Sequence, residues 1–296
     1  MNVLSLFDGI SCGRLALERA GIKVDKYYAS EIKKHAIKCS QDNWSDIIQI
    51  GDITKVHYID GVLYTENGNF ETDIDLLIGG SPCQNFSMAR YSQYEVEGLD
   101  GDKSKLFYEY LRLKNSINPK YWLLENVKMK KEHKMQLDEF LQASGVLINS
   151  RLVSYQNRPR YYWCNWNISR PEDKHISFQD YKETNHNECV KYRLHDTPSR
   201  RKMWNNGEGK NTQGNCKNIT YEDKISCITR KQDRSPNSGL IELDDFCRYL
   251  TRRELEQGQT LPIGYTDCLS YNQAQDVLGD GWTVDVIAHI LRSMSR

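Results

Sequence analysis

The chain has 296 residues, 40 lysines and arginines against 40 aspartates and glutamates, and 39% hydrophobic residues. This composition excludes a disordered chain and predicts a large core, in one large domain or in a large domain with a small one. Zero net charge excludes only a uniformly basic surface, because nucleic-acid contacts depend on local patches. The apolar runs are far shorter than a membrane span, and Met1 leads directly into a strand-like run, so we expect neither a membrane segment nor a secretory signal.

The nine cysteines include no Cys-x-x-Cys pair and no Cys/His ligand spacing. An odd number without such spacing argues against a disulfide framework and against a zinc site. We therefore expect a cytoplasmic protein without a metal.

Strand-like and helix-like segments alternate along the first half of the chain. Strands are predicted at 2–7, 25–30, 47–50, 74–78, 121–124, 151–155 and 160–166, and helices at about 15–20, 33–39, 104–117 and 134–143. This alternation predicts an α/β fold with a doubly wound, mainly parallel sheet.

The pattern changes after Trp166, where a polar stretch with little periodicity extends to about residue 246. It is too long for an ordinary loop, so we predict a small second domain with short strands at 167–247. Helical spacing returns at 252–259 and 284–294. The large domain would then comprise residues 1–166 and 248–296.

Glycines and acids follow the first three predicted strands, where open α/β sheets bind ligands. Gly9 and Gly13 permit a tight turn after the first strand and a close approach of its backbone to a ligand. Glu31 lies 18 residues beyond Gly13, close to the ~20-residue offset of acids that bind ribose hydroxyls. Asp52 follows the third strand and could accept from an adenine amino group. Singly each acid is more often solvated, but together they favour an adenosine-bearing ligand.

Four further residues carry reactive or charged groups at strand boundaries. Cys83 follows an apolar strand and a Gly-Gly-Ser-Pro turn, which suits a presented thiol better than a packed one. Glu125 follows the apolar run 121–124, where burial would raise its pKa and let it act as a proton donor. Arg158 and Arg160 could hold a phosphate and a base edge, or form a surface pair.

Six segments together resemble the cytosine-C5 DNA methyltransferase family, in its order and over nearly the whole chain. They are Phe-Asp-Gly-Ile-Ser-Cys-Gly at 7–13, Gly-Ser-Pro-Cys-Gln-Asn-Phe-Ser at 80–87, Glu-Asn-Val at 125–127, Gln-Asn-Arg-Pro-Arg at 156–160, and the segments 248–265 and 278–284. The resemblance implies a Rossmann-like, S-adenosylmethionine-dependent methyltransferase.

Two residues depart from the common family pattern. Asp280 stands where Asn is usual, which affects one cofactor contact, and Asp8 stands where many members have Ala. Asp8, the stretch 158–165 and Trp282 look like the animal de novo enzymes, whereas the length resembles phage or bacterial modification enzymes. We favour the phage or bacterial setting.

The resemblance implies a covalent mechanism on a cytosine flipped out of the duplex. Cys83 would add to C6, Glu125 would share its proton with N3, and Arg160 would bind O2. Arg158 would hold the backbone or the loop. Within the predicted loop 84–105, Gln84 and Ser87 would face the DNA.

The resemblance also implies residues for the cofactor and for recognition of DNA. The cofactor set is Phe7, Asp8, Gly9, Ile10, Gly13, Glu31, Ile32, Asp52, Ile53, Pro82, Leu106, Asp280, Trp282 and Val284. Residues 227–230 resemble the hydrophobic-Thr element of the recognition domain, so Thr229 and Arg230 are expected to contact DNA. We expect a monomer that acts on double-stranded DNA, with a cognate restriction endonuclease or a phage as its context.

Three alternatives remain open. An RNA cytosine methyltransferase shares the fold, although a long recognition region favours DNA. A catalytically silent DNA-binding protein would not need Cys83, Glu125 and both arginines. A nicotinamide-dependent oxidoreductase would have a Gly-x-Gly-x-x-Gly turn, which this chain lacks.

Overall fold

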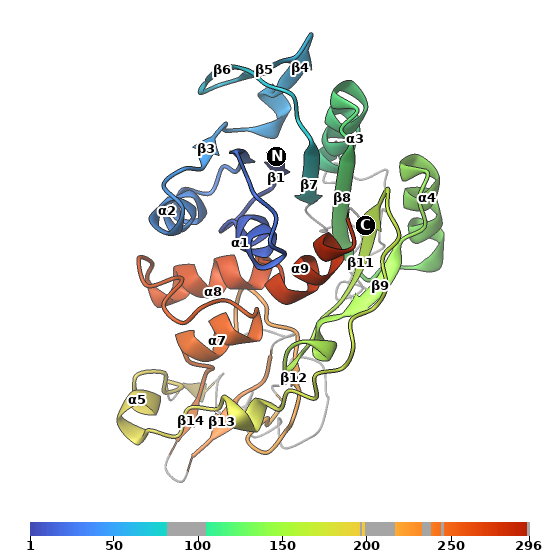
Figure 1. Ribbon diagram of the computed structural model, residues 1–296. Coiled ribbons are helices and arrows are strands. Elements are labelled where there is room, and N and C mark those ends of the chain that lie inside the picture. The colour runs from blue at the N-terminus through green and yellow to red at the C-terminus, as the bar shows by residue number, and fades with distance from the viewer. Residues whose placement is uncertain (82–104, 196, 199–216, 233–237, 244–245, 295–296) are drawn as a thin grey trace. The chain divides into compact units, whose positions relative to one another are not determined.

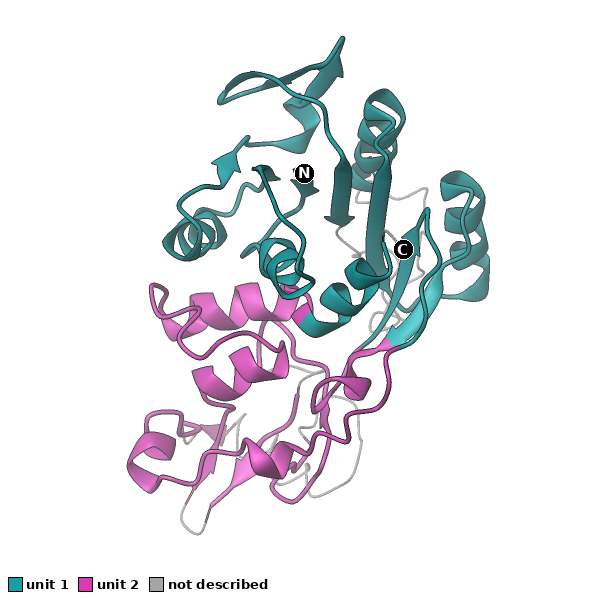
Figure 2. Ribbon diagram, viewed as in Figure 1, with its two compact units in different colours: residues 1–148, 159–170, 285–296 teal, residues 149–158, 171–284 magenta. Residues whose placement is uncertain are grey.

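The computed structural model describes residues 1–81, 105–195, 197–198, 217–232, 238–243 and 246–294. By packing, the chain divides into two compact units (Figure 2). Unit 1 comprises Met1–Ile148, Pro159–Arg170 and Asp285–Arg296, and unit 2 comprises Asn149–Arg158 and Pro171–Val284. The domains predicted from the sequence, 1–166 with 248–296 and 167–247, follow the change of sequence pattern after Trp166, and that division stays a prediction.

Unit 1 is built on a seven-stranded sheet (Figure 1). The strand order is β3 (Ile48–Gln49), β2 (Lys26–Ser30), β1 (Asn2–Leu6), β7 (Leu76–Gly80), β8 (Tyr121–Val127), β11 (Pro159–Cys164) and β9 (Val146–Asn149). Neighbouring strands are parallel from β3 to β8, and β11 is antiparallel to β8. The predicted α/β class with a mainly parallel sheet is confirmed.

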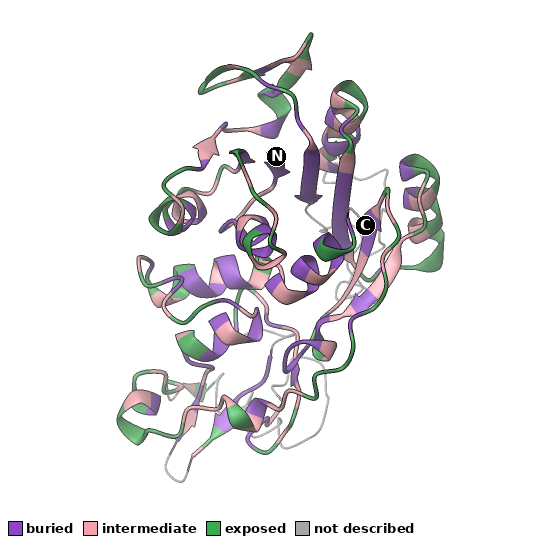
Figure 3. Ribbon diagram, viewed as in Figure 1, coloured by how far each residue is buried: buried purple, intermediate pink, exposed green. Residues whose placement is uncertain are grey.

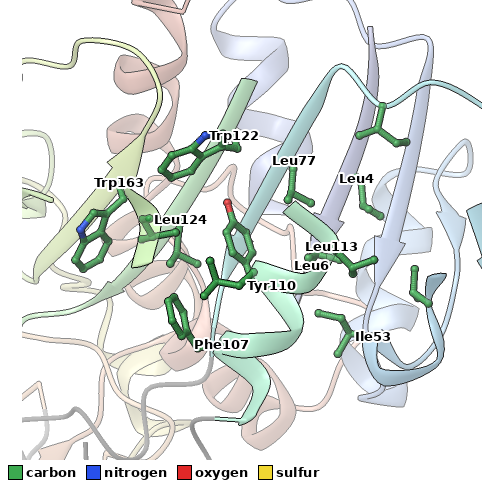
Figure 4. Packing of buried hydrophobic residues seen from close by; sticks show 14 of the residues in the cluster. Leu4, Leu6, Ile53, Leu77, Phe107, Tyr110, Leu113, Trp122, Leu124 and Trp163 are labelled. Atoms are coloured by element: carbon green, nitrogen blue, oxygen red, sulfur yellow. The ribbon is translucent and has the colours of Figure 1, made fainter. Parts of the chain in front are cut away.

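Among the described residues of the chain, five helices accompany the sheet: α1 (Cys12–Arg19), α2 (Lys34–Asn43), α3 (Lys105–Ile117), α4 (Lys131–Leu141) and α9 (Val284–Arg292). The central strands β1, β7 and β8 are almost wholly buried (Figure 3), as expected of apolar runs covered on both faces. Phe107 and Tyr110 of α3 pack with leucines of these strands in one hydrophobic cluster (Figure 4). No described helix has the length and apolar character needed to cross a membrane.

The strand predicted at 151–155 is wrong. Residues Ser150–Leu152 form a short 3₁₀ helix instead, and the strand, β9, lies just before it. The Asn149 side chain accepts from the backbone N–H of Arg151 at 3.1 Å, and such a cap starts a helical turn where the apolar pattern alone indicated a strand.

A three-stranded antiparallel meander lies between β3 and β7 in the sequence and was not predicted. Its strands are β4 (His57–Ile59), β5 (Val62–Thr65) and β6 (Gly68–Glu71), which lie side by side outside the central sheet (Figure 1). Asp60 and Gly61 have φ of 49° and 80°, the backbone of a tight two-residue hairpin turn. The buried side chain of Leu63 ties the meander to the core cluster.

Unit 2 holds short strands, short helices and long loops. Its elements include β10 (Gln156–Asn157), α5 (His186–Val190), β12 (Ile225–Ser226), β13 (Ile241–Glu242), β14 (Cys247–Arg248), α7 (Arg252–Gly258) and α8 (Tyr271–Asp280). A fully buried ion pair joins Arg248 to Glu254 at 2.8 Å. Glu254 also forms a capping box with Thr251 at the start of α7, so one carboxylate both caps the helix and fixes β14.

Gly145 gives a direct test of the packing in unit 1. The indole of Trp163 lies against Gly145 and donates to the Asp138 carboxylate at 2.7 Å. A Cβ at position 145 would lie 2.5 Å from the ring, closer than real contacts allow. We expect Gly145→Ala to lower the free energy of unfolding by about 1–3 kcal/mol, measured by urea denaturation. Unchanged stability would show that Trp163 is not held against this residue.

Candidate active site

The carboxyl ends of β1, β2, β3, β7 and β8 lie at one edge of the sheet, because these strands are parallel. This edge brings together five candidate residues from four separate segments of unit 1. They are Phe7, Asp8, Glu31, Asp52 and Glu125. The strand order therefore puts the predicted polar residues at the same edge of the sheet, as expected from the sequence.

The turn after β1 is built from residues with left-handed backbone. Phe7, Gly9 and Ser11 have φ of 58°, 62° and 61°. The backbone N–H of Asp8 donates to Ser30 O at 3.1 Å, which ties the turn to the end of β2. A Cβ at Gly9 would meet nothing within 4 Å, so the outer side of the turn is open. Ile10 and Gly13, in contrast, are buried.

Asp8 directs its carboxylate to side chains of the protein. It accepts hydrogen bonds from the hydroxyls of Ser11 at 2.5 Å and Tyr27 at 2.7 Å. The Ser11 oxygen also lies 2.6 Å from that of Ser40, and since Ser11 donates to Asp8, Ser40 is the donor to Ser11. Burial raises the pKa of Asp8 despite these bonds.

This raised pKa has a consequence for stability. The contribution of Asp8 to the free energy of unfolding is fully present below about pH 4, the usual carboxyl value, and is lost as the pH rises through the raised pKa. We expect Asp8→Asn to lose less stability than the wild type between pH 4 and pH 8, measured by urea denaturation. Asp42→Asn, exposed on α2, is the control. A stability difference independent of pH would contradict the assignment.

Glu31 closes the end of β2 onto the turn after β1. Its Oε2 accepts from Gly9 N at 2.9 Å, and Oε1 accepts from the backbone N–H groups of Ile32 at 2.8 Å and Lys33 at 2.9 Å. Ile32 is 70% exposed. The carboxylate is thus fixed in place beside the open turn.

Asp52 begins a short 3₁₀ helix, Ile53–Lys55, after β3. Its Oδ1 accepts from Thr54 N at 2.9 Å, while Oδ2 has no hydrogen-bond partner among the described residues. Ile53 is buried against the core cluster, and Leu106 of α3 packs partly buried against the same cluster. Glu31 and Asp52 therefore present two oriented carboxylates at adjacent strand ends.

The ends of β7 and β8 are joined side by side. Gly80 is paired with Glu125, and the amide of Asn126 donates to the hydroxyl of Ser81 at 3.0 Å. Four predicted site residues follow Ser81 and lie outside the described residues: Pro82, Cys83, Gln84 and Ser87.

The structure brings Glu125 and Arg160 together. Arg160 Nε lies 3.0 Å from Glu125 Oε1, across the antiparallel pair β8 and β11. The two side chains are only 11% and 14% exposed. A carboxylate and a guanidinium in this setting are held with little freedom, so two of the predicted catalytic groups form one unit.

Arg158 lies in unit 2, where its guanidinium binds backbone carbonyls. It donates to Ile228 O at 2.9 Å, Gly279 O at 3.0 Å and Gly281 O at 2.8 Å. The residue is 4% exposed. Arg158 therefore joins the segment at Ile228 to the end of α8, although the two are distant in sequence.

The remaining candidates also lie in unit 2; they are Thr229, Arg230, Asp280, Trp282 and Val284. Arg230 pairs with Asp276 at 2.5 Å and with Asp280 at 3.6 Å, and Val284 is buried. A Cβ at Gly279 would lie 2.2 Å from Arg230 N, so Gly279 lets the segment with Thr229 and Arg230 pack against α8. Sequence reasoning missed this contact. Its signal in the sequence was Gly279, one of two glycines in the segment 278–284.

Comparison with known proteins gives a consistent result. The family profile described as C-5 cytosine-specific DNA methylase matches residues 1–296. An orphan methyltransferase, M.Rho11sI of Bacillus phage rho11s, is 31% identical over 175 residues, which are 55% of this chain and 32% of the phage protein. DNA (cytosine-5)-methyltransferase DRM2 of Arabidopsis thaliana is 38% identical over 120 residues, 38% of this chain and 18% of the plant protein. The matched regions thus span a third or less of these relatives.

Among solved structures, the Entamoeba histolytica methyltransferase EhMeth has the same fold. Its TM-score is 0.72 at 19% sequence identity, with 99% of this chain and 97% of the EhMeth chain covered.

Proposed function

Because the chain belongs to the family of C-5 cytosine-specific DNA methylases, we propose that it transfers a methyl group from S-adenosyl-L-methionine to C5 of cytosine in double-stranded DNA. The observation that supports this most directly is the Glu125–Arg160 pair at the carboxyl edge of the sheet. A carboxyl group and a guanidinium side by side suit a ring that carries a basic nitrogen, N3, next to a carbonyl oxygen, O2.

The donor and acceptor set at the same edge fits an adenosine-bearing cofactor. The open side of the Gly9 turn leaves room for a ligand next to the backbone, and the carboxylate of Glu31 is oriented to receive ribose hydroxyls. Asp52 would accept from an adenine amino group through Oδ2, since Oδ1 already accepts from Thr54 N. S-adenosylmethionine supplies an activated methyl group when bound; the residues of this edge orient it.

The catalytic residues act on the cytosine ring. The Cys83 thiolate forms a bond to C6, which breaks the aromaticity and makes C5 nucleophilic. Glu125 gives a proton to N3 and Arg160 donates to O2, so that charge developing on the ring is neutralised. After C5 takes the methyl group, a water molecule acting as base removes the C5 proton and the C6–sulfur bond breaks with its electron pair going to sulfur. N3 returns its proton to Glu125, which restores the ring and frees the Cys83 thiolate.

The target base must leave the duplex before C6 can be attacked, which costs a few kcal/mol of unstacking. We assign sequence reading to the predicted domain 167–247, with Thr229 and Arg230 as contacts to DNA. Arg158 acts there as a positioning residue through its carbonyl contacts. We further propose that the protein acts as a monomer in a phage or bacterium. There it would be an orphan enzyme or would act beside a restriction endonuclease.

One experiment tests the substrate and the cofactor together. Purified protein is incubated with tritiated S-adenosylmethionine and DNA of mixed sequence, with matched RNA in parallel, and the labelled nucleoside is identified after digestion. Label in 5-methyldeoxycytidine is expected. Label from RNA alone would replace DNA by RNA as the substrate, and no label on any DNA of high sequence complexity would contradict the proposal.

A further inference from the structure

The turn between β5 and β6 reaches back to the segment that follows β3. Glu66 Oε2 accepts from the backbone N–H of Asp52 at 3.1 Å, and Oε1 accepts from Lys55 Nζ at 2.5 Å. The next residue, Asn67, donates its amide to Gln49 O at 2.9 Å. Two neighbouring side chains thus hold the segment 49–55 at three points.

Gly51 lies at the centre of these contacts. Its φ of 82° is a left-handed backbone that favours glycine, and a Cβ there would lie 2.9 Å from Glu66 Oε2. The missing side chain therefore allows both the turn after β3 and the close approach of the Glu66 carboxylate. The Ser30 hydroxyl donates to Gly51 O at 2.8 Å, which holds the same residue from the end of β2.

The meander that carries Glu66 is itself anchored in unit 1. Leu63 is fully buried in the core, and Phe70 packs on Tyr28 of β2 with ring centroids 5.3 Å apart. The Tyr58 hydroxyl donates to Thr72 O at 3.2 Å. Because its base is tied to the sheet, the meander can hold the loop in one conformation.

The charge state of Glu66 supports a lasting contact. Lys55 and the backbone N–H of Asp52 lower the pKa of this carboxyl, and Glu66 in turn raises the pKa of Lys55. Both groups are therefore charged at neutral pH. Their exposure makes the ion pair weak by itself, so the hydrogen bond to the backbone is the contact that matters for the loop.

We propose that the Glu66–Asn67 turn is a positioning device for the cofactor, which holds Asp52 and Ile53 in the conformation that receives the adenine ring. Glu66 accepts from the Asp52 N–H, and the Thr54 N–H donates to Asp52 Oδ1, so Oδ2 is the oxygen of Asp52 left for the ligand. Without the turn, binding would have to order this loop, and the affinity would fall by that cost. This inference rests on the proposed function, because it deepens the cofactor site.

The test measures binding of S-adenosylhomocysteine to the full chain by isothermal titration calorimetry. Glu66→Ala is expected to raise the Kd roughly three- to tenfold, as the loss of one charged hydrogen bond does. Glu66→Gln keeps an acceptor for the Asp52 N–H and is expected to stay close to the wild type. Glu71→Ala removes an exposed carboxylate from the same meander and is the matched control.

Two further readouts separate positioning from general destabilisation. In Glu66→Ala, the KM for S-adenosylmethionine should rise while kcat and the KM for DNA stay unchanged. Hydrogen exchange of the peptide around Asp52 should become faster, with exchange in β1 and β7 unaffected.

The outcomes test the positioning role of Glu66 separately from the proposed methyltransferase function. Wild-type protein that does not bind S-adenosylhomocysteine would overturn the proposed function. Wild-type binding together with an unchanged Kd in Glu66→Ala would overturn the positioning role and leave the proposed function standing. Equal weakening in Glu71→Ala, or faster exchange throughout unit 1, would also overturn it.

Discussion

Replacing Cys83 by serine is expected to lower the rate of methyl transfer by on the order of 10⁴-fold or more, since the hydroxyl is a far weaker nucleophile than the thiolate. Binding of S-adenosylhomocysteine and of DNA should remain, because no group of the cofactor edge is changed. The rate is measured in single turnover with tritiated S-adenosylmethionine.

DNA containing 5-fluorocytosine adds a direct readout of the covalent bond. A fluorine at C5 cannot leave as a proton does, so the adduct on C6 should persist in wild-type protein as a complex that survives denaturation. Cys83→Ser should form none, while Cys268→Ser, the same exchange at a cysteine outside the proposed mechanism, should form it normally. Turnover near the wild-type level in Cys83→Ser would eliminate the covalent mechanism.

Replacing Glu125 by glutamine is expected to lower the rate of methyl transfer by roughly 10²–10⁴-fold, the usual contribution of a positioned proton donor. Glutamine keeps the shape of the side chain and an oxygen that can accept from Arg160, which lies 3.0 Å from Glu125 Oε1. The amide has no acidic proton to give to N3, so the loss would come from chemistry rather than from packing.

The matched control is Glu132→Gln, which removes an exposed carboxylate from the first turn of α4. Single-turnover rates and the Kd for DNA are measured for both variants. A rate within threefold of the wild type in Glu125→Gln would show that another group protonates the ring. A large loss of DNA binding would instead make Glu125 a binding residue.

The main sheet could be predicted because its central strands are buried on both faces. The runs at 3–6, 76–78 and 121–124 have almost no polar interruption, and such runs are typical of parallel strands. The β4–β6 meander was not predictable in this way, because only Leu63 of β5 is buried and its other strands have mixed exposure. Helix α8 was missed as well, although Ser270 and Gln273 form a capping box at its start.

The candidate site was predictable where chemistry and strand ends coincide. Glu31, Asp52 and Glu125 each stand at the end of an apolar run, and parallel strands gather such ends at one edge. The partners of Arg158 could not be predicted, because it binds backbone carbonyls 70 and 121 residues away that carry no sequence signal. The positioning role proposed for Glu66 could not be predicted from the sequence either, because it depends on a hairpin that folds back onto Gly51.

The division of the chain into two units has a consequence for biosynthesis. The chain passes from one unit to the other four times, and the last segment of unit 1 is Asp285–Arg296. Helix α9 in this segment buries Ile287, and Arg19 binds Asp285 at 2.7 Å, so it is an integral part of the unit that the first residues begin. On the ribosome, unit 1 can therefore be completed only after Asp285–Arg296 have been translated, and the residues that contact α9 lack these contacts until then. Chaperones would have their longest opportunity to bind the nascent protein in that interval.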